Sequence, residues 1–491
     1  MEHHEISLLL RSRAPILILE THEETRAVEL LTNVAISMGR SIFKWSVARG
    51  LQRIDLAMDP QAFLKEPVKV VEHIASADVD AIYVLLDFHP YLQDPAIVRH
   101  LKELGQTMRF RKSRVVLVSH HLEVPVEIKK LAVDCKLALP DDQALLDIVR
   151  EEANAYTKKN PGERVNTEQK ILDQLVNNLK GLTYNDARRL AHTAIFDDGA
   201  ITQSDLPEVM QAKYKLLSND SLLAFEFETR SFSDLAGMKG LKKWLHQRES
   251  FFHQKADVPG MDPPKGILLL GVQGCGKSVA AKAVAGAWGV PLLRLDFGSL
   301  YNKYIGETES NIREALKMAE IMSPCVLWMD ELEKGISVRE NDDGTSQRIL
   351  GTLLTWMAEN KNPVFIVATS NDIQQLPPEL IRKGRLDEVF FVDLPSEEVR
   401  QNIFRIHAEK RELELASLDL SALAALTDGF SGSEIEQLVV SAIYAAHAKN
   451  GSVDMSLLID EIKNTRPLSV LMAEKIASLR HWAEGRTVPV D

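Results

Sequence analysis

The chain has 491 residues, of which 45% are hydrophobic and 26% are charged, a balance typical of a soluble globular protein with roughly two to four domains. The formal net charge of −12 disfavours indiscriminate binding to nucleic acid. No apolar run approaches the ~20 residues that cross a bilayer, and the polar first residues do not predict a signal peptide. Three cysteines are too few for a disulfide framework, so we expect a reducing compartment such as the cytoplasm or a stroma.

Short apolar runs recur in the first 200 residues, at 17–19 and 84–86, and each is followed by an acidic residue. Runs of this kind predict buried strands. A turn at 197–199 closes the region. Residues 201–231 then predict a connecting helix, with Pro207 near its start, and a linker.

The apolar run 267–270 leads into a segment that fits the phosphate-loop pattern G-x-x-x-x-G-K-[ST], and an alanine-rich stretch at 279–287 follows it. The segment consists of Gly271, Val272, Gln273, Gly274, Cys275, Gly276, Lys277 and Ser278. Its glycines let successive N–H groups point at phosphate oxygens, and the helix after the loop adds the positive end of its dipole. Lys277 can reach the β- and γ-phosphates and Ser278 can hold Mg²⁺. We therefore predict ATP and Mg²⁺ as cofactors.

Cys275 lies inside this loop, and two interpretations of it are possible. A helix N-terminus lowers the pKa of a thiol, which would suit redox control. The simpler interpretation is that Cys275 is a small residue that the loop tolerates.

A second apolar run, 326–329, ends in two carboxylates, Asp330 and Glu331. Ligand sites in parallel sheets lie at the carboxyl ends of the strands. Asp330 is therefore placed to bind Mg²⁺, and Glu331 is placed to polarise the attacking water. Acidic residues after a strand are common, so it is the order after a phosphate loop that makes this signal specific.

A third strand is predicted at 364–369, and Asn371 follows it. Asn371 could bind the γ-phosphate or the water, or it could simply be a turn residue. Arg382 and Arg385, on either side of a glycine, could be solvated charges, or they could present guanidinium groups to a phosphate across a subunit boundary. The residues alone favour solvated charge.

On these motifs, and on 233–237 and 429–433, the stretch 232–433 resembles the AAA family of ring-forming ATPases. The resemblance implies that the segment ending in Gly237 borders the adenine pocket and that Gly432 begins a lid helix. It also implies that Asn371 is sensor 1 and that Arg382 and Arg385 are fingers acting on a neighbour's nucleotide. Ser433 departs from the usual alanine at its position.

In AAA motors the place of residues 300–307 holds the first pore loop, and Tyr304, Ile305 and Gly306 fit its aromatic–aliphatic–glycine pattern. An aromatic face beside a flexible glycine could grip a peptide of any sequence. The alternative is that Tyr304 packs in the domain core. A second pore loop is expected near residues 341–345.

The N-terminal third repeats the same order of elements at a nearly constant offset. The matched segments are 17–20 with 268–271, 84–87 with 327–330, 139–142 with 394–397, and 181–186 with 429–434. We infer a duplicated fold whose first copy does not hydrolyse ATP. Its counterpart of the phosphate loop contains no glycine and three carboxylates, and Phe88 stands where a catalytic carboxylate is needed. Arg26 falls in register with Lys277.

A degenerate AAA-like domain joined to one active AAA module resembles the family named for hypothetical chloroplast reading frame 46, found in plastids, cyanobacteria and other bacteria. Residues 87–90, 271–278, 330–334 and 467–474 carry this resemblance. The expected fold is α/β throughout. We predict a degenerate domain at 1–200, a connecting helix and linker at 201–231, a large ATPase domain at 232–395, and a helical lid with a C-terminal helix (469–482) at 396–491.

The predicted function is ATP hydrolysis by a homo-oligomer, a hexameric ring, that remodels or threads a protein client. The alternative is an ATP-dependent switch or assembly scaffold that threads nothing. Neither the client nor the pathway follows from the sequence, and nucleic acid is disfavoured as a partner by the acidic balance.

Overall fold

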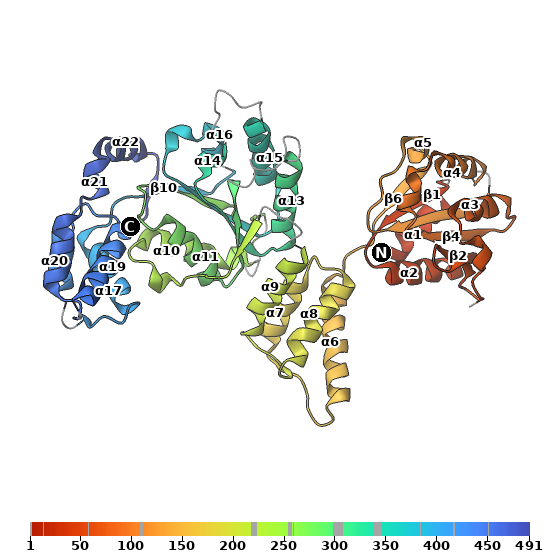
Figure 1. Cartoon of the computed structure of the whole chain (residues 1–491), viewed down its shortest axis with the longest axis horizontal. Coiled ribbons are helices and arrows are strands. Elements are labelled where there is room, and N and C mark those ends of the chain that lie inside the picture. The colour runs from red at the N-terminus through yellow and green to blue at the C-terminus, as the bar shows by residue number, and fades with distance from the viewer. Residues whose placement is uncertain are drawn as a thin grey trace. The chain divides into compact units, whose positions relative to one another are not determined.

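The computed structural model describes residues 2–12, 14–56, 58–108, 111–217, 223–253, 258, 260–297, 308–336, 345–382, 384–415, 418–449 and 451–491 (Figure 1). The chain divides into two compact units. The first contains Met1–Glu151 and Leu182–Ala191, and the second contains Glu152–Gly181 and His192–Asp491. Within the described residues, no helix is long and apolar enough to cross a membrane.

The first unit is built on a six-stranded sheet with the order β3-β2-β4-β5-β1-β6. Its strands are β1 (Ile16–Glu20), β2 (Ser41–Ser46), β3 (Gly50–Arg53), β4 (Ala81–Leu86), β5 (Arg114–Ser119) and β6 (Ala132–Cys135). All neighbours are parallel except β2 and β3, which form an antiparallel edge. The predicted apolar runs become β1 and β4. Both are interior strands of the sheet, so their side chains are buried on both faces, apart from Glu20 at the end of β1.

Helices cover both faces of this sheet, since alternate strand residues point to opposite sides. One face packs on α3 (Pro67–Ser76) and α4 (Pro95–Met108). The other packs on α1 (Glu2–Arg11) and α2 (Glu24–Ser37), as Figure 1 shows. The remaining short elements are η1 (Ala62–Leu64), η2 (His89–Gln93) and α5 (Val126–Lys129).

Helices α6 (Asp142–Lys159) and α8 (Tyr184–Phe196) each contribute residues to both units. The second unit also contains α7 (Gln169–Leu179), α9 (Asp205–Leu217) and a small parallel pair, β7 (Asn166–Thr167) with β8 (Ala200–Ile201). The connecting helix predicted after residue 201 is α9. The predicted hinge at 218–221 lies outside the described residues.

The second unit contains a seven-stranded sheet with the order β9-β11-β12-β13-β10-β14-β15. The strands are β9 (Leu223–Glu226), β10 (Gly266–Gly271), β11 (Leu292–Leu295), β12 (Cys325–Met329), β13 (Val364–Ser370), β14 (Glu388–Val392) and β15 (Val488–Pro489). Only β9 runs antiparallel to its neighbour. The six strands of the first unit's sheet follow the same spatial order as β9, β11, β12, β13, β10 and β14. In both sheets the strand at the first edge is antiparallel to its neighbour. The α/β fold is therefore present in both units.

Two hydrophobic layers enclose this second sheet. α10 (Lys239–Phe252) and α11 (Lys277–Trp288) cover one face. On the other face lie α13 (Thr308–Ile321) and α15 (Thr345–Glu359), with further side chains from α9 and from α22 (Ala473–Ala483). Shorter elements are η3 (Phe232–Asp234), α14 (Leu332–Ile336), η4 (Ile373–Gln375) and α16 (Pro378–Ile381).

A helical lid follows the sheet, with its own core from α17 (Glu397–Glu409), α18 (Leu420–Leu426), α19 (Gly432–Ala448) and α20 (Met455–Asn464). The hydroxyl of Ser396 caps α17 by accepting the N–H of Val399. The single helix expected at 469–482 is wrong. The structure has α21 (Leu468–Leu471) and α22 (Ala473–Ala483) separated at Met472, whose φ and ψ of −125° and 31° interrupt the helix.

Candidate nucleotide site

The phosphate loop lies between β10 and α11, at the carboxyl edge of the sheet, and glycine is required in it for two separate reasons. A side chain at Gly271 would collide with the carbonyl oxygen of Val392 on the neighbouring strand. Gly274 has a φ of 77°, and a Cβ there would collide with the hydroxyl of Ser433 in the lid. The loop can therefore approach both a strand and the lid, and the N–H of Val272 donates to Val392 O on that strand at 3.0 Å.

Lys277 is the first residue of α11 and is only 6% exposed. Its Nζ donates to the carbonyl oxygens of Gly271 (3.0 Å) and Val272 (2.7 Å). Burial lowers the pKa of Lys277 to about 8, and nearby acidic groups oppose that shift. The loop thus holds the ammonium group inside the cradle that the sequence predicted.

Asp330 and Ser278 come together although they are far apart in the chain. Ser278 Oγ lies 3.4 Å from Asp330 Oδ1, to which it donates. Thr369, near the end of β13, donates to the same Oδ1 at 2.7 Å and accepts the N–H of Glu331 at 3.0 Å. A hydroxyl and a carboxylate are the oxygen ligands that Mg²⁺ prefers, so this donor set fits the metal.

Glu331 leaves β12 with a φ of 48°, which is uncommon for a residue other than glycine. This turn directs its carboxylate toward Asn371, whose Nδ2 lies 3.4 Å from Glu331 Oε1. The main chain of Asn371 is held in turn, because its N–H donates to Glu333 Oε1 at 3.0 Å. The candidate catalytic carboxylate and the candidate sensor are therefore neighbours.

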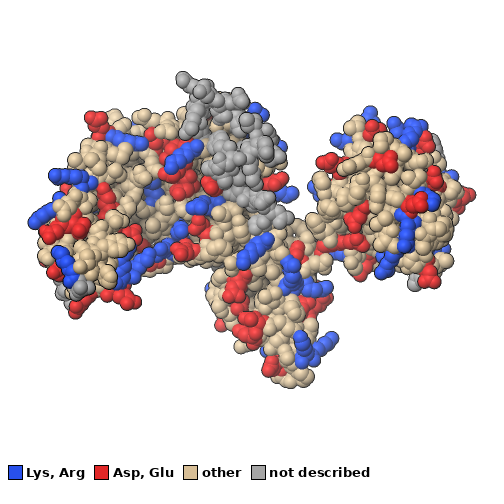
Figure 2. All heavy atoms as spheres, viewed as in Figure 1, with Lys and Arg blue, Asp and Glu red and all other residues tan. Residues whose placement is uncertain are grey.

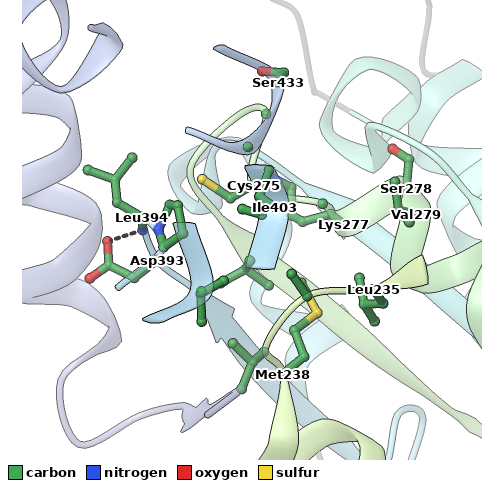
Figure 3. Close-up of a pocket in the computed structure, with 18 of the residues that line it drawn as sticks. Leu235, Met238, Cys275, Lys277, Ser278, Val279, Asp393, Leu394, Ile403 and Ser433 are labelled. Atoms are coloured by element: carbon green, nitrogen blue, oxygen red, sulfur yellow. Dashed lines mark hydrogen bonds between the residues drawn. The ribbon is translucent and has the colours of Figure 1, made fainter. Parts of the chain in front are cut away.

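These groups line one cavity of about 700 Å³. The phosphate loop forms one wall, and the end of β14 with α17 and α19 of the lid forms another; Figure 3 shows Cys275, Lys277 and Ser278 on the loop, with Ser433 and Ile403 contributed by the lid. The N–H of Ser433 donates to the carbonyl oxygen of Gly274 at 3.0 Å. Apolar side chains such as Leu235 and Met238 also line the cavity, beside Gly276 of the loop, and offer the kind of surface that an adenine base would require.

Most of the predicted site residues line this cavity. They are Gln273, Gly274, Cys275, Gly276, Lys277, Ser278, Asp330, Glu331, Asn371 and Gly432. Gly271 and Val272 stand just behind the lining, where their carbonyls hold Lys277. Gly237, flanked by the lining residues Ala236 and Met238, packs against Val399 of the lid.

Arg382 and Arg385 do not line the cavity of their own chain. Arg382 follows α16 and is exposed, and Arg385 donates from Nη1 to the carbonyl oxygen of Glu379. The predicted pore residues Tyr304, Ile305 and Gly306 lie outside the described residues, as do 341–344 of the second predicted loop.

Several lining residues were not identified from the sequence. They include Thr369, Arg230 and Lys410, and the segment 489–491, which starts at the last residue of β15. The N–H of Leu241 donates to Val490 O at 3.1 Å, and the N–H of Lys239 donates to Asp491 Oδ1 at 2.9 Å. A two-residue strand is too short to produce a period, so nothing in the sequence indicated that this segment joins the sheet.

Cys275 is half-buried, and burial raises the pKa of its thiol to about 12. The charge of Lys277 opposes this shift without cancelling it. The neutral thiol is a poor nucleophile, so the structure favours the interpretation of Cys275 as a tolerated small residue.

Family profiles match most of the chain. The profile described as ATPase family associated with various cellular activities (AAA) matches residues 267–394, and the AAA+ lid domain matches 417–457. The N-terminal and second domains of SpoVK-like AAA ATPases match residues 2–137 and 143–220. These matches cover both units and show that the chain is an AAA ATPase.

Full-length relatives agree with the profiles. The AAA domain-containing protein ycf46 of Guillardia theta is 34% identical over 490 residues, which cover 98% of this chain and 94% of the relative. Its namesake from Pyropia yezoensis is 32% identical over 489 residues, 98% of both chains. A proteasome-activating nucleotidase from Aeropyrum pernix is 36% identical over 215 residues, which are 42% of this chain and 52% of that protein. With phosphate loop, carboxylates and lid gathered around one cavity, and with similarity along its whole length, the chain belongs to the ycf46 family of AAA ATPases.

Proposed function

We propose that the protein is an oligomeric, Mg²⁺-dependent ATPase that uses hydrolysis to remodel or thread a protein client. In this proposal Lys277 binds the β- and γ-phosphates, and Ser278 and Asp330 hold Mg²⁺, which would neutralise phosphate charge when bound. Glu331 accepts the proton of the attacking water, and Asn371 orients that water through its contact with Glu331.

The observation that carries the oligomeric part is the position of the two arginines. The cavity already contains groups for binding nucleotide, holding a metal and activating water, but neither Arg382 nor Arg385 lines it. Arg382 is exposed and does not line the cavity of its own chain, so a nucleotide phosphate that it contacts would belong to another subunit. The proposed hexameric ring would repeat this contact at every interface.

A protein client is supported by three observations. The proteasome-activating nucleotidase is similar to 42% of this chain, and 304–306 resembles a peptide-gripping pore loop. Acidic and basic side chains are also interspersed over the described residues on the face drawn in Figure 2, rather than gathered into one basic surface for nucleic acid. We place this activity in the cytoplasm, or in the stroma if the gene is plastid-encoded.

Mixing two inactive variants tests whether the arginines act between subunits. Arg385→Ala should reduce ATP turnover on the order of a thousandfold, and Lys277→Ala should abolish it. In an equal mixture, about a quarter of the interfaces would pair an intact phosphate loop with an intact arginine, so activity should return toward that level. Full activity of Arg385→Ala as a monomer would refute the proposal.

Threading is tested separately with Tyr304→Ala, and Tyr301→Ala is the matched aromatic control. An unfolded protein such as casein should stimulate ATP turnover of the wild type and of Tyr301→Ala, but not of Tyr304→Ala. Equal stimulation of all three proteins would favour the switch or scaffold and would leave the ATPase assignment intact. Glu331→Gln, which should bind ATP and hydrolyse it slowly, can then retain the natural client for identification.

A further inference from the structure

A second group of polar side chains lies at the carboxyl edge of the first unit's sheet. Asp87, His89 and His120 each offer one ligand atom, and these three atoms lie within 4.8 Å of one another. None of the three contributes to the nucleotide site, which is built from the second unit. In the first unit's sheet, this cluster lies at the edge that corresponds to the one where Asp330 and Asn371 lie in the ATPase sheet.

The fold brings these residues together from two neighbouring strands. β4 and β5 are parallel, so their carboxyl ends meet at one edge. Asp87 follows β4 directly, and its N–H donates to Val118 O on β5 at 2.9 Å. His89 begins η2 two residues later, and His120 follows β5. Asp87 has a φ of 48°, the same value as Glu331 has after β12.

One imidazole is already oriented. His89 Nδ1 lies 2.6 Å from the hydroxyl of Ser119, a residue that is 2% exposed. A buried hydroxyl that engages Nδ1 leaves Nε2 as the nitrogen for a ligand, which is how outer partners orient metal-binding histidines. The ring of His120 lies edge-on to His89 with 4.7 Å between centroids, and it stacks on His22 at 5.8 Å.

We propose that Asp87, His89 and His120 bind a divalent first-row transition metal, with Zn²⁺ as the best-matched ion. Two imidazoles and one carboxylate form a ligand set that suits Zn²⁺ and disfavours Mg²⁺ and Ca²⁺, which take oxygen ligands. Asp87 and His120 are exposed, so the metal keeps open positions toward solvent. Ligand atoms around tetrahedral zinc lie about 3.3 Å apart, and rotation of these two exposed side chains provides the approach.

The site differs in kind from the Mg²⁺ site of the ATPase unit. It has no glycine cradle beside it, because the β1–α2 connection contains none. Its metal is therefore bound by side chains alone and requires no nucleotide. Binding should be the same with and without ATP, which separates this proposal from the proposed ATPase mechanism.

The test uses the full chain, stripped with a chelator and kept in excess Mg²⁺ to occupy oxygen-ligand sites. Zn²⁺ is titrated against a chromophoric competitor, and Co²⁺ is used for its visible spectrum. The wild type should bind one Zn²⁺ that the double variant His89→Ala/His120→Ala does not bind. The Co²⁺ spectrum should lack the thiolate charge-transfer band that binding by cysteine would produce.

Three further variants complete the test. His121→Ala removes the adjacent exposed histidine and should leave Zn²⁺ affinity unchanged. Asp87→Asn keeps a residue that tolerates positive φ and should weaken binding at least about a hundredfold, and Ser119→Ala should weaken it by about 10- to 100-fold. Equal Zn²⁺ affinity in the wild type, Asp87→Asn and Ser119→Ala would overturn the proposal, even if the double variant failed to fold.

Discussion

The two sheets of this protein share a strand order but differ at the edge where a nucleotide would bind. In the second unit residues 272–276 connect β10 to α11, whereas in the first unit only 21–23 connect β1 to α2. The shorter connection corrects the register inferred from the sequence: Glu24, not Arg26, is the first residue of the helix and corresponds to Lys277. The first unit keeps the fold without the loop, so fold and phosphate binding are separable properties.

Other features of that edge were kept. Asp87, one residue after β4, and Glu331, two residues after β12, have the same φ of 48°, which is uncommon for a residue with a Cβ, although the sequence match paired Asp87 with Asp330. The backbone conformation after the strand is thus common to both units, while the side chains beside it differ: His89 and His120 lie beside Asp87, and Asn371 lies beside Glu331. An edge without a glycine loop can therefore still bring polar side chains together.

The largest effect is expected at Lys277, the first residue of α11, and Glu24, the first residue of α2, is its comparison. Lys277→Ala removes the only ammonium group that the cavity lining contributes from the phosphate loop, and ATP turnover should fall on the order of a thousandfold or more. Glu24→Ala changes an exposed residue at the corresponding position of the first unit and should leave turnover unchanged. Steady-state phosphate release measures both. A large loss with Glu24→Ala would mean that the first unit takes part in hydrolysis.

The next effect concerns the pH dependence of stability, for which one buried cationic side chain from each unit is compared: Lys213 in the second unit and Arg114 in the first. Lys213 Nζ donates to Lys180 O (2.6 Å) and Ile321 O (2.8 Å), and burial lowers the pKa of Lys213 to about 8. Between pH 8 and 10.5 the unfolded chain binds more protons than the folded one, so the free energy of unfolding should rise with pH by up to about 3 kcal/mol. The neighbouring Cys325 stays neutral through most of this window, because burial raises its pKa to about 12.

Hydrogen exchange of α9 amides in urea at pH 8 and pH 10 measures this dependence, and Lys213→Met should remove it. Arg114 is the comparison in the first unit. It donates to the carbonyl oxygens of Ser12, Arg111 and Ser113, and burial also lowers its pKa, but guanidinium groups stay protonated in proteins. The first unit should show no such rise from Arg114. An unchanged slope in Lys213→Met would show that another group titrates.

A smaller effect is expected from two left-handed glycines. Gly274→Ala combines a φ of 77° with a collision against Ser433, and it should weaken ATP binding about tenfold. Gly39→Ala in the first unit has a φ of 65° but open space around it, so it should cost stability without changing ATP affinity. Fluorescent-nucleotide titration compares them. Ser433→Gly should restore part of the affinity of Gly274→Ala, and failure to do so would assign the whole loss to backbone strain.

The smallest effect concerns Cys275. With a thiol pKa of about 12, its thiolate fraction at pH 8 is roughly a thousandfold below that of an ordinary cysteine. Brief treatment with iodoacetamide should therefore leave ATP turnover unchanged, and mass spectrometry should find Cys275 unmodified. Rapid modification with loss of activity would restore the redox interpretation.

Sequence reasoning located the nucleotide site because each of its parts has a local signal. A glycine loop after an apolar run, or paired carboxylates after another, can be recognised within ten residues or so. The contribution of Thr369 has no such signal, since a threonine at the end of an apolar run is also an ordinary strand residue. The cluster at Asp87 and His120 was missed for a related reason: its ligands come from different strands, and only the parallel pairing of β4 and β5 brings them together.

The bond from Ser433 N–H to Gly274 O gives α19 the properties of a lever. The helix has 17 residues and is about 25 Å long, and its first turn is attached to the loop that would wrap the phosphates. A tilt of roughly 5° at that attachment would displace the far end of the helix by about 2 Å. Small rearrangements around the phosphates could thus be amplified into lid movement by the length of one helix.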